Sequence, residues 1–313
     1  MDTPLVSICS ITYNHAPYIR QCLDGFLMQK TKFKYEIIIH DDASTDGTAE
    51  IIKEYVEKYP NLITPIFQKE NQYSKGVRGM FPRYCFPRAK GKYIALCEGD
   101  DYWTDPLKLQ KQVDFLEANP DFVMCSHLCD FVDQETGNKL FSYPDFGNNE
   151  STVLRLGNFV RGGEITQTAT LFFRNLKKIV STINACNKSA DIVLYYILLM
   201  YGPGFCIPEV MSIYRIHNEG VWTKLSMNKR IVWEFEMKLS ICEFDKSEKS
   251  ALFLLLQFQR LIPRKLILKK WKMFTKVFQI FIRHFGLQFT LKLIIDKLFF
   301  NKKLANNHPL LIK

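Results

Sequence analysis

The chain has 313 residues, and 47% of them are apolar, which is enough for the core of one large or two modest domains and excludes a disordered or low-complexity protein. The net charge of +10 is concentrated near the C-terminus, because residues 251–313 hold thirteen Lys and Arg against Asp296 alone, which leaves 29 basic and 31 acidic residues in residues 1–250. This asymmetry is typical of a nearly neutral globular body followed by a basic arm for nucleic acid or anionic lipid.

The nine cysteines are an odd number, and no Cys-x-x-Cys pair occurs among them. Free buried thiols in a reducing compartment are therefore expected rather than a disulfide framework or a zinc site. The N-terminal residues lack a basic segment followed by an apolar one, so no secretory signal is predicted. No uncharged apolar run reaches the roughly 18 residues of a membrane-spanning helix.

The first part of the chain alternates short apolar runs with segments of helical periodicity. Strands are predicted over residues 5–11, 35–40, 63–67, 93–96 and 122–125. Helices are predicted over residues 17–29, 48–59 and 106–119. Alternating strands and helices predict an α/β fold with a mainly parallel central sheet and helices on both faces.

The pattern is looser in the second part. Residues 131–161 are interpreted as a long excursion over the sheet, followed by strands at 168–175, 205–208 and 210–217 and a helix at 191–201. We expect a catalytic domain over residues 1–225, with a nucleotide-binding half at 1–120 and an acceptor half at 121–225, and a helical tail over 226–313.

Three predicted strands end in polar clusters. These clusters are Thr12-Tyr13-Asn14, Asp41-Asp42 and Asp100-Asp101. The carboxyl ends of parallel strands lie on one edge of a sheet, where ligands bind in α/β proteins. The sequence therefore predicts that the three clusters converge on one cleft.

The last cluster belongs to an acidic stretch that holds Glu98, Asp100 and Asp101. Neighbouring carboxylates repel one another unless a positive charge lies among them. Carboxylates at a strand end suit a hard divalent cation that keeps some waters and binds a phosphate on its open side. The alternative is a solvated turn that caps the following helix.

These segments together resemble the family 2 glycosyltransferases, which have the GT-A fold with a Rossmann-like nucleotide-binding half. The resemblance covers roughly residues 4–222 and rests on four motifs in this order: residues 6–14, 41–48, 89–94 and 98–101. It implies inverting transfer of a sugar from a nucleotide-diphospho donor, usually UDP-linked, with Mn2+ or Mg2+.

The resemblance also implies roles for individual residues. Thr12, Tyr13, Asn14 and Asp42 would bind the nucleotide, with Tyr13 against the base. Asp100 and Asp101 would hold ribose and metal, whereas the family commonly has Asp at the position of Glu98, so direct ligation by Glu98 is not expected. Asp191 matches the catalytic base, and His217 lies in a segment like the family's closing motif, where a His can approach the metal.

The chemistry that these roles require is coherent. An inverting transfer needs one base to take the proton of the acceptor hydroxyl. It also needs positive charge on the leaving diphosphate, which a divalent ion supplies. Each residue has a simpler alternative, since Tyr13 and Asn14 suit a turn, Asp191 suits a helix N-cap and His217 suits a structural contact.

Two other functions remain open from the sequence. A nucleotidyltransferase shares the fold type, but residues 12–17 lack the glycine and Lys or Arg expected of a triphosphate loop. A non-catalytic adaptor at the membrane periphery would not need the intact acids. No Gly-x-Gly-x-x-Gly follows the first strand, which argues against a dinucleotide dehydrogenase.

The tail predicts the cellular location. Residues 274–285 place apolar residues on one helical face and basic residues on the other. We expect this amphipathic helix to bind an anionic membrane surface. The alternative is that its apolar face packs on the body or on a partner. The protein would then act on the cytoplasmic face of the cell membrane on a lipid-linked or growing glycan, and no nucleic acid is expected as a partner.

Overall fold

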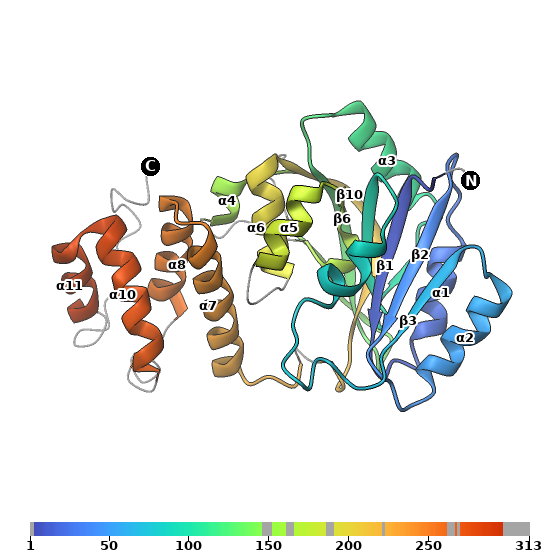
Figure 1. The fold of residues 1–313 in the computed structure, drawn as a ribbon, viewed down its shortest axis with the longest axis horizontal. Coiled ribbons are helices and arrows are strands. Elements are labelled where there is room, and N and C mark those ends of the chain that lie inside the picture. Colours follow the sequence, from blue (N-terminus) through green and yellow to red (C-terminus); the bar gives the residue numbers. More distant parts are fainter. Residues whose placement is uncertain are drawn as a thin grey trace. The chain divides into compact units, whose positions relative to one another are not determined.

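The computed structural model describes residues 3–145, 152–160, 166–185, 191–220, 223–261, 267 and 270–296, and it divides into two compact units (Figure 1). Unit 1 comprises Met1–Leu156 and Glu164–Thr223, and unit 2 comprises Gly157–Gly163 and Lys224–Lys313. Nothing in the composition distinguishes residues 157–163 from the surrounding chain, although the structure assigns them to unit 2.

Unit 1 is built on a sheet whose described strands have the order β3-β2-β1-β4-β9-β6-β10-β5, with β7 beside β6 and β8 beside β10. The strands are β1 (Val6–Thr12), β2 (Tyr35–Asp41), β3 (Ile63–Phe67), β4 (Tyr93–Glu98), β5 (Tyr102–Trp103), β6 (Met124–Asp133), β7 (Lys139–Tyr143), β8 (Val153–Leu154), β9 (Phe172–Arg174) and β10 (Gly204–Ile216). The α/β class predicted from the alternation of strands and helices is confirmed.

The neighbouring strands β3, β2, β1 and β4 are parallel to one another. Strand β9 is antiparallel to both β4 and β6. Strand β10 is again parallel to β6, whereas β5 pairs with it in the antiparallel direction. The predicted pair of strands at 205–208 and 210–217 is one continuous strand, β10, with irregular register near Val210. A bulge lets one strand bend while it continues its pairing, so the break in the sequence pattern marks a bulge rather than a loop.

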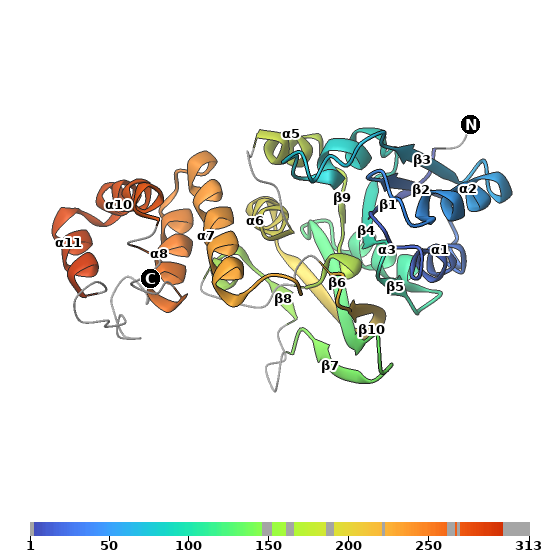
Figure 2. The ribbon, with the colours of Figure 1, turned by 90° about the horizontal axis from the view of Figure 1, so that it is seen from below.

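Helices cover the parallel part of the sheet on both faces (Figure 2). Helices α1 (Ile19–Leu27), α2 (Thr48–Lys58) and α3 (Lys108–Ala118) contribute to one buried cluster with alternate residues of β1 and β2. In α1 the buried residues Ile19, Cys22, Leu23 and Phe26 recur at helical spacing, as the sequence predicts. The opposite face contacts the short helical turns η1 (Phe81–Cys85) and η2 (Phe86–Arg88), and η1 contacts α5 (Lys177–Ala185).

The expected excursion over residues 131–161 contains more regular structure than its composition suggests. Strand β6 continues to Asp133, and β7 returns beside it as a hairpin whose turn includes Gly137 at a φ of 72°. The short strand β8 follows, while residues 146–151 and 161–165 lie outside the described part of the chain. The predicted strand at 168–175 is a single helical turn, η3 (Thr168–Thr170), followed by β9.

Unit 2 is helical. Its helices are α4 (Leu156–Val160), α7 (Met227–Phe244), α8 (Glu248–Leu261), α10 (Trp271–Phe285) and α11 (Leu287–Ile295). Their core includes Phe235 of α7, Phe258 of α8 and Phe274 of α10. No helix in the described part of the chain is long and apolar enough to cross a membrane.

The apolar stripe of the tail packs inside this helical core. Phe274, Val277 and Phe281 are fully buried, and Phe278 is 7% exposed. Phe274, Val277, Phe278 and Phe281 are therefore covered inside the helical core and are not available to lipid, whereas Ile282 is 40% exposed. Binding of the tail to a membrane stays a prediction. The alternative of internal packing holds for those four residues, and Lys272, Lys276 and Arg283 remain exposed on the opposite face.

Candidate active site

The polar ends of β1, β2 and β4 lie on one edge of the sheet. Thr12 pairs with Asp41, and Ile11 pairs with Glu98, so the last residues of the three strands stand at the same level. A Cβ atom on Gly99 would lie 2.8 Å from the Cβ and Oγ1 atoms of Thr12. The glycine after Glu98 thus allows the acidic stretch to cross closely above the end of β1.

Three carboxylates gather at this edge. One oxygen from each of Glu98, Asp100 and Asp101 lies within 4.8 Å of the others. Asp101 is 1% exposed, and its Oδ1 accepts a hydrogen bond of 3.0 Å from the backbone N–H of Arg215. Burial, together with the charges of Asp100 and Glu98, raises the pKa of Asp101 well above its ordinary value. The backbone N–H and the charge of Arg215 oppose this shift but do not outweigh it.

Asp100 differs from Asp101 because two imidazoles face it. Its Oδ2 lies 3.2 Å from Nε2 of His217 and 3.6 Å from Nε2 of His15. Burial acts to raise the pKa of Asp100, but the charges and hydrogen bond of His15 and His217 outweigh it, and the net pKa is lowered. Asp100 is accordingly the member of the cluster that is held in its ionised form.

Glu98 lies within the cluster, whereas the family resemblance predicts no direct ligation by it. Burial and then the charges of Asp100 and Asp191 raise the pKa of Glu98 to about 8. Its carboxyl group is therefore mostly protonated at neutral pH until a cation binds beside it.

Asp191 is the first residue of α6 (Asp191–Tyr201), and its Oδ1 accepts a hydrogen bond of 2.7 Å from the N–H of Ile192. The N-cap alternative and the catalytic role remain compatible. Its charge acts on Glu98 and, with all three clustered acids, on Tyr214, whose pKa is raised mainly by burial. Asp191 thus shares an electrostatic environment with the acidic cluster, while residues 186–190 before it lie outside the described part of the chain.

The residues present fit a divalent cation. Oδ2 of Asp101 and Nδ1 of both His15 and His217 are buried and have no hydrogen-bond partner among the described residues. Buried polar atoms of this kind are normally satisfied, and exceptions indicate a missing ion, ligand or water. Three carboxylates whose oxygens lie within 4.8 Å of one another are suitable donors for Mn2+ or Mg2+.

The loops after β1 and β2 are fastened to each other. The backbone N–H of Asn14 donates to Oγ of Ser44, and its side-chain oxygen accepts from the N–H of Thr45. Asp46 accepts from the N–H of Ala16. Asn14 itself adopts a φ of 54°, a conformation in which Asn is more stable than most residues. The two loops therefore form one unit that flanks the acids.

Asp42 and Tyr13 occupy different surroundings in this unit. Tyr13 is 44% exposed at the surface, where a flat ligand could stack on its ring. Asp42 is 4% exposed, and its two carboxylate oxygens accept hydrogen bonds from the N–H groups of Gln72 and Tyr73. Asp42 thus holds residues 71–73 beside the loops, which leaves only its remaining lone pairs for a ligand. The hydroxyl of Thr12 is buried and has no hydrogen-bond partner among the described residues.

Arg215 holds the acidic stretch in place through hydrogen bonds to Asp100 and Asp101. Besides its backbone bond to Asp101, its guanidinium donates to the carbonyl of Asp100 and to Oε1 of Gln21. The guanidinium carbon lies 4.3 Å from the ring centre of Tyr102 and 5.3 Å from that of Tyr18. Arg215 is 5% exposed, and these contacts hold the loop in place.

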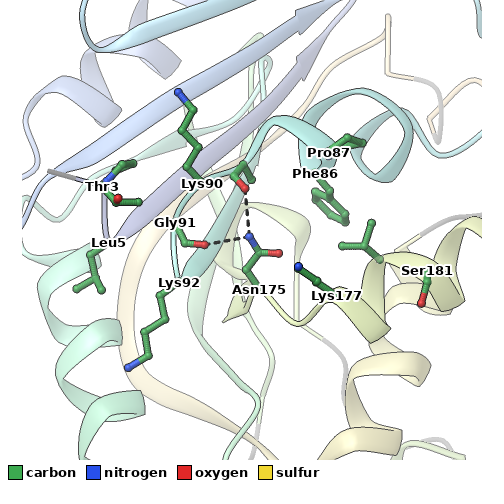
Figure 3. Close-up of a pocket in the computed structure, with 13 residues that line it drawn as sticks. Thr3, Leu5, Phe86, Pro87, Lys90, Gly91, Lys92, Asn175, Lys177 and Ser181 are labelled. Atoms are coloured by element: carbon green, nitrogen blue, oxygen red, sulfur yellow. Dashed lines mark hydrogen bonds between the residues drawn. The ribbon is translucent and has the colours of Figure 1, made fainter. Parts of the chain in front are cut away.

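A surface cavity of about 820 Å³ lies at the opposite edge of the sheet (Figure 3). It is lined near the amino ends of β1 and β4 by Leu5, Gly91 and Lys90, and Asn175 fastens this region through bonds to the carbonyls of Ala89 and Gly91. None of the clustered acids lines it. The cavity is therefore separate from the candidate site.

The sequence predicts no role for two side chains at the site. His15 follows Asn14 directly and faces Asp100, and Tyr18 packs on His217 with ring centres 4.8 Å apart. The position of His15 beside a polar strand end was a usable signal. The position of Tyr18 at the start of α1 was not, because its partner is distant in sequence.

Comparisons with known proteins bear on the whole arrangement. The family described as Glycosyl transferase family 2 matches residues 7–178. An uncharacterized protein of Mycobacterium tuberculosis is 39% identical over 232 residues, which are 73% of this chain and 64% of that protein. A Bacillus subtilis protein provisionally named a teichuronic acid biosynthesis glycosyltransferase is 36% identical over 113 residues, covering 36% of this chain and 42% of that protein. The chain thus spans less than two thirds of the length of these relatives.

Solved structures share the fold at low sequence identity. Staphylococcus aureus TarS 1–349 in complex with UDP-GlcNAc has a TM-score of 0.61 at 18% identity, covering 88% of this chain and 79% of that chain. A Pyrobaculum calidifontis mannosyltransferase in complex with GDP-Man and Mn2+ has a TM-score of 0.56 at 17% identity, covering 94% of this chain and 79% of that chain.

Proposed function

The chain belongs to glycosyl transferase family 2, and from this premise we propose that it is an inverting, metal-assisted glycosyltransferase that moves a sugar from a UDP-sugar to a hydroxyl group of a lipid-linked or growing cell-surface glycan. The observation that carries the proposal is the cluster of Glu98, Asp100 and Asp101, with its buried unpartnered oxygen, at the carboxyl edge of the sheet. The UDP-GlcNAc and GDP-Man complexes of proteins with this fold support a nucleotide-sugar donor.

On this proposal the donor and the base act from two sides. Tyr13, Thr12, Asn14 and Asp42 bind the nucleotide, and Asp191 takes the proton of the acceptor hydroxyl as its oxygen attacks the anomeric carbon of the sugar. The bond between that carbon and the diphosphate oxygen breaks, and UDP leaves with the electron pair. In-line attack from the face opposite the diphosphate inverts the configuration at the anomeric carbon.

Asp100, Asp101 and His217 would hold the divalent cation, with Glu98 close enough to assist. When bound, the cation supplies positive charge to the leaving diphosphate without a proton transfer. Asp100 is prepared for this role because its pKa is already lowered, whereas Glu98 must release a proton first.

The test is UDP release from candidate UDP-sugars in the presence of Mn2+, with wild type compared with Asp191→Asn and Asp101→Asn. Both variants should lower kcat by about 100-fold or more, because each removes a group that acts in the transition state. Asp114→Asn on the exposed face of α3 is the matched control and should keep full activity. Undiminished turnover in both site variants would refute the assignment. Pyrophosphate release from a nucleoside triphosphate would instead favour a nucleotidyltransferase.

The location at the inner face of the cell membrane also remains a proposal. It is supported by the excess of basic residues after residue 250 and by the surface-polymer role in the name of the Bacillus subtilis relative. Because most of the apolar stripe of α10 is buried, the contact would be made mainly by exposed basic residues of unit 2.

A further inference from the structure

Lys108, the first residue of α3, is a lysine with no exposed surface. Its Nζ donates a hydrogen bond of 2.7 Å to Oε1 of Gln112, one helical turn further on. The same nitrogen lies 3.9 Å from the ring centre of Trp103, which is 1% exposed. Among the described residues no carboxylate forms an ion pair with it.

Burial of this lysine lowers the stability of the folded protein. Burial of an ammonium group without a carboxylate partner carries a large desolvation penalty, and an apolar side chain of similar size would avoid it. An amide oxygen and the face of an indole ring compensate only part of this penalty. Its retention needs a reason beyond filling the core.

Gln112 and Trp103 extend the contact to neighbouring elements. Nε2 of Gln112 donates to the carbonyls of Cys125 in β6 and of Thr170 in η3, both at 3.0 Å. Nε1 of Trp103 donates to the carbonyl of Ala169, also in η3, at 2.8 Å. The three side chains thus bind the turn η3 through two of its carbonyl groups.

The elements joined in this way carry the two halves of the site. Trp103 lies in β5, two residues after Asp101. The position of its ring therefore constrains the acidic stretch. Thr166 precedes η3 in the chain. Its hydroxyl forms a short buried contact with the hydroxyl of Tyr195. Tyr195 lies one helical turn after Asp191 in α6.

We propose that Lys108, Trp103 and Gln112 form a positioning cluster that sets the spacing between the metal-binding acids and the helix that carries the catalytic base. Lys108 acts through the indole of Trp103 on the donor side and through Gln112 on the acceptor side. It touches no substrate, and this role rests on the proposed transferase activity.

The charge of Lys108 is part of this role, because only the ammonium form is attracted to the indole face. Burial lowers the pKa of Lys108 to about 7, against the opposing effects of Cys97 in β4, Cys125 in β6 and Asp105 before α3. His127 in β6 also feels its charge, and burial lowers the pKa of that imidazole well below its ordinary value. The ammonium is therefore lost as the pH rises through neutrality.

The first experiment measures kcat, KM for the UDP-sugar and UDP affinity for Lys108→Met, which keeps the length of the side chain and removes its charge. The kcat per folded molecule should fall by about 100-fold, since a small misplacement of reacting groups has an effect of that size. UDP affinity measured without metal should stay within about twofold, because the loops after β1 and β2 are not part of the cluster. Trp103→Phe keeps a ring for Lys108 but removes the bond to Ala169, and the two substitutions should combine less than additively in kcat.

A purely structural role predicts lower stability with full kcat in the folded fraction, and that result would overturn the proposal. A spectroscopic measurement is independent of turnover. With Trp222, Trp233 and Trp271 replaced by Phe, the fluorescence of Trp103 should titrate with a midpoint near 7, and Lys108→Met should abolish the titration. An unchanged titration in Lys108→Met would overturn the charge role. If wild type releases no UDP from any donor, the proposed function fails, whereas the fluorescence result still decides whether the lysine acts on Trp103.

Discussion

At the scale of single residues, Asp100 and Asp101 are adjacent in sequence but have different surroundings. Asp100 faces the imidazoles of His15 and His217, and its pKa is lowered. Asp101 faces a backbone N–H and keeps one buried oxygen without a described partner. The pair therefore combines an ionised carboxylate with one that a cation must stabilise before it ionises fully.

Arg215 provides a test of how much the acidic stretch depends on its support. Arg215→Met should weaken Mn2+ binding by about 10-fold or more, because the residues that orient metal ligands affect affinity on that scale. Calorimetric titration of the protein with Mn2+ measures the change. Arg20→Met, which removes an exposed arginine paired with Glu54, is the matched control. Equal Mn2+ affinity in wild type and Arg215→Met would contradict the supporting role.

His40 predicts a pH dependence of stability. Burial lowers its pKa from 6.5 to about 4, and it stacks on Tyr84 with ring centres 4.5 Å apart. Because the unfolded chain takes up a proton at higher pH than the folded one, stability is present above pH 6.5 and is lost as the pH falls toward 4. We expect a loss of about 2 kcal/mol between roughly pH 7.5 and 5 from this group.

Urea unfolding at the two pH values measures the loss, with His40→Gln as the comparison. The variant should lose about 2 kcal/mol less than wild type over the same interval. A wild-type pH dependence that persists in His40→Gln would assign the effect to other groups.

The sequence predicted the residues of the acidic stretch and of the loop after β1, because each lies at the end of a clearly patterned strand. It did not predict which partners these residues meet. His15 facing Asp100, Asp42 bound to residues 72 and 73, and Lys108 against Trp103 all depend on contacts between elements. Local patterns carry no information on such distant pairs, so the roles of individual side chains could not be derived from them.

At the scale of elements, the close pairing of β1 and β4 depends on Gly91. A Cβ atom at this position would lie 2.5 Å from the backbone nitrogen of Ser7 and 2.7 Å from the carbonyl carbon of Val6. Backbone atoms cannot move aside cheaply, so the strands would have to separate.

Gly91→Ala should therefore lower the free energy of unfolding by about 3 kcal/mol or more. Gly157→Ala in α4 is the control, because a Cβ there meets nothing within 4 Å and alanine favours a helix. Urea denaturation of both variants gives the comparison. A loss below about 1 kcal/mol in Gly91→Ala would mean that the strands adjust more freely than the structure indicates.

Prediction of elements succeeded where a regular pattern repeats over enough residues. The strands from β1 to β4 and helices α1 to α3 lie where the periodicity places them, within a few residues at their ends. Prediction was less accurate for β9, which is short and antiparallel to its neighbours. It also divided β10 into two strands, because the bulge in β10 resembles a loop in the sequence. Both strands are defined by pairing with strands that are distant in the sequence, which a local pattern does not reveal.

At the scale of the molecule, the charge asymmetry predicts vesicle binding through unit 2. Replacing exposed Lys272 and Arg283 of α10 by Glu should weaken binding to anionic vesicles by about 30-fold or more, since each basic residue near the surface contributes about 1 kcal/mol. Co-sedimentation at low and high salt measures the change. Replacing Lys53 and Lys58 of α2 by Glu changes the net charge equally and is the control. An equal loss in the control would show that only total charge matters.

The helix α4 has a consequence for synthesis of the chain. It lies between two segments of unit 1, yet it belongs to unit 2, where Phe159 packs on Phe253 of α8 with ring centres 5.1 Å apart. On the ribosome, Phe159 emerges well before α8 has been translated, and unit 1 can fold around this interruption while its apolar side chains are still exposed. The nascent chain can therefore pass through a state in which unit 1 is complete while Phe159 still lacks its partner on α8.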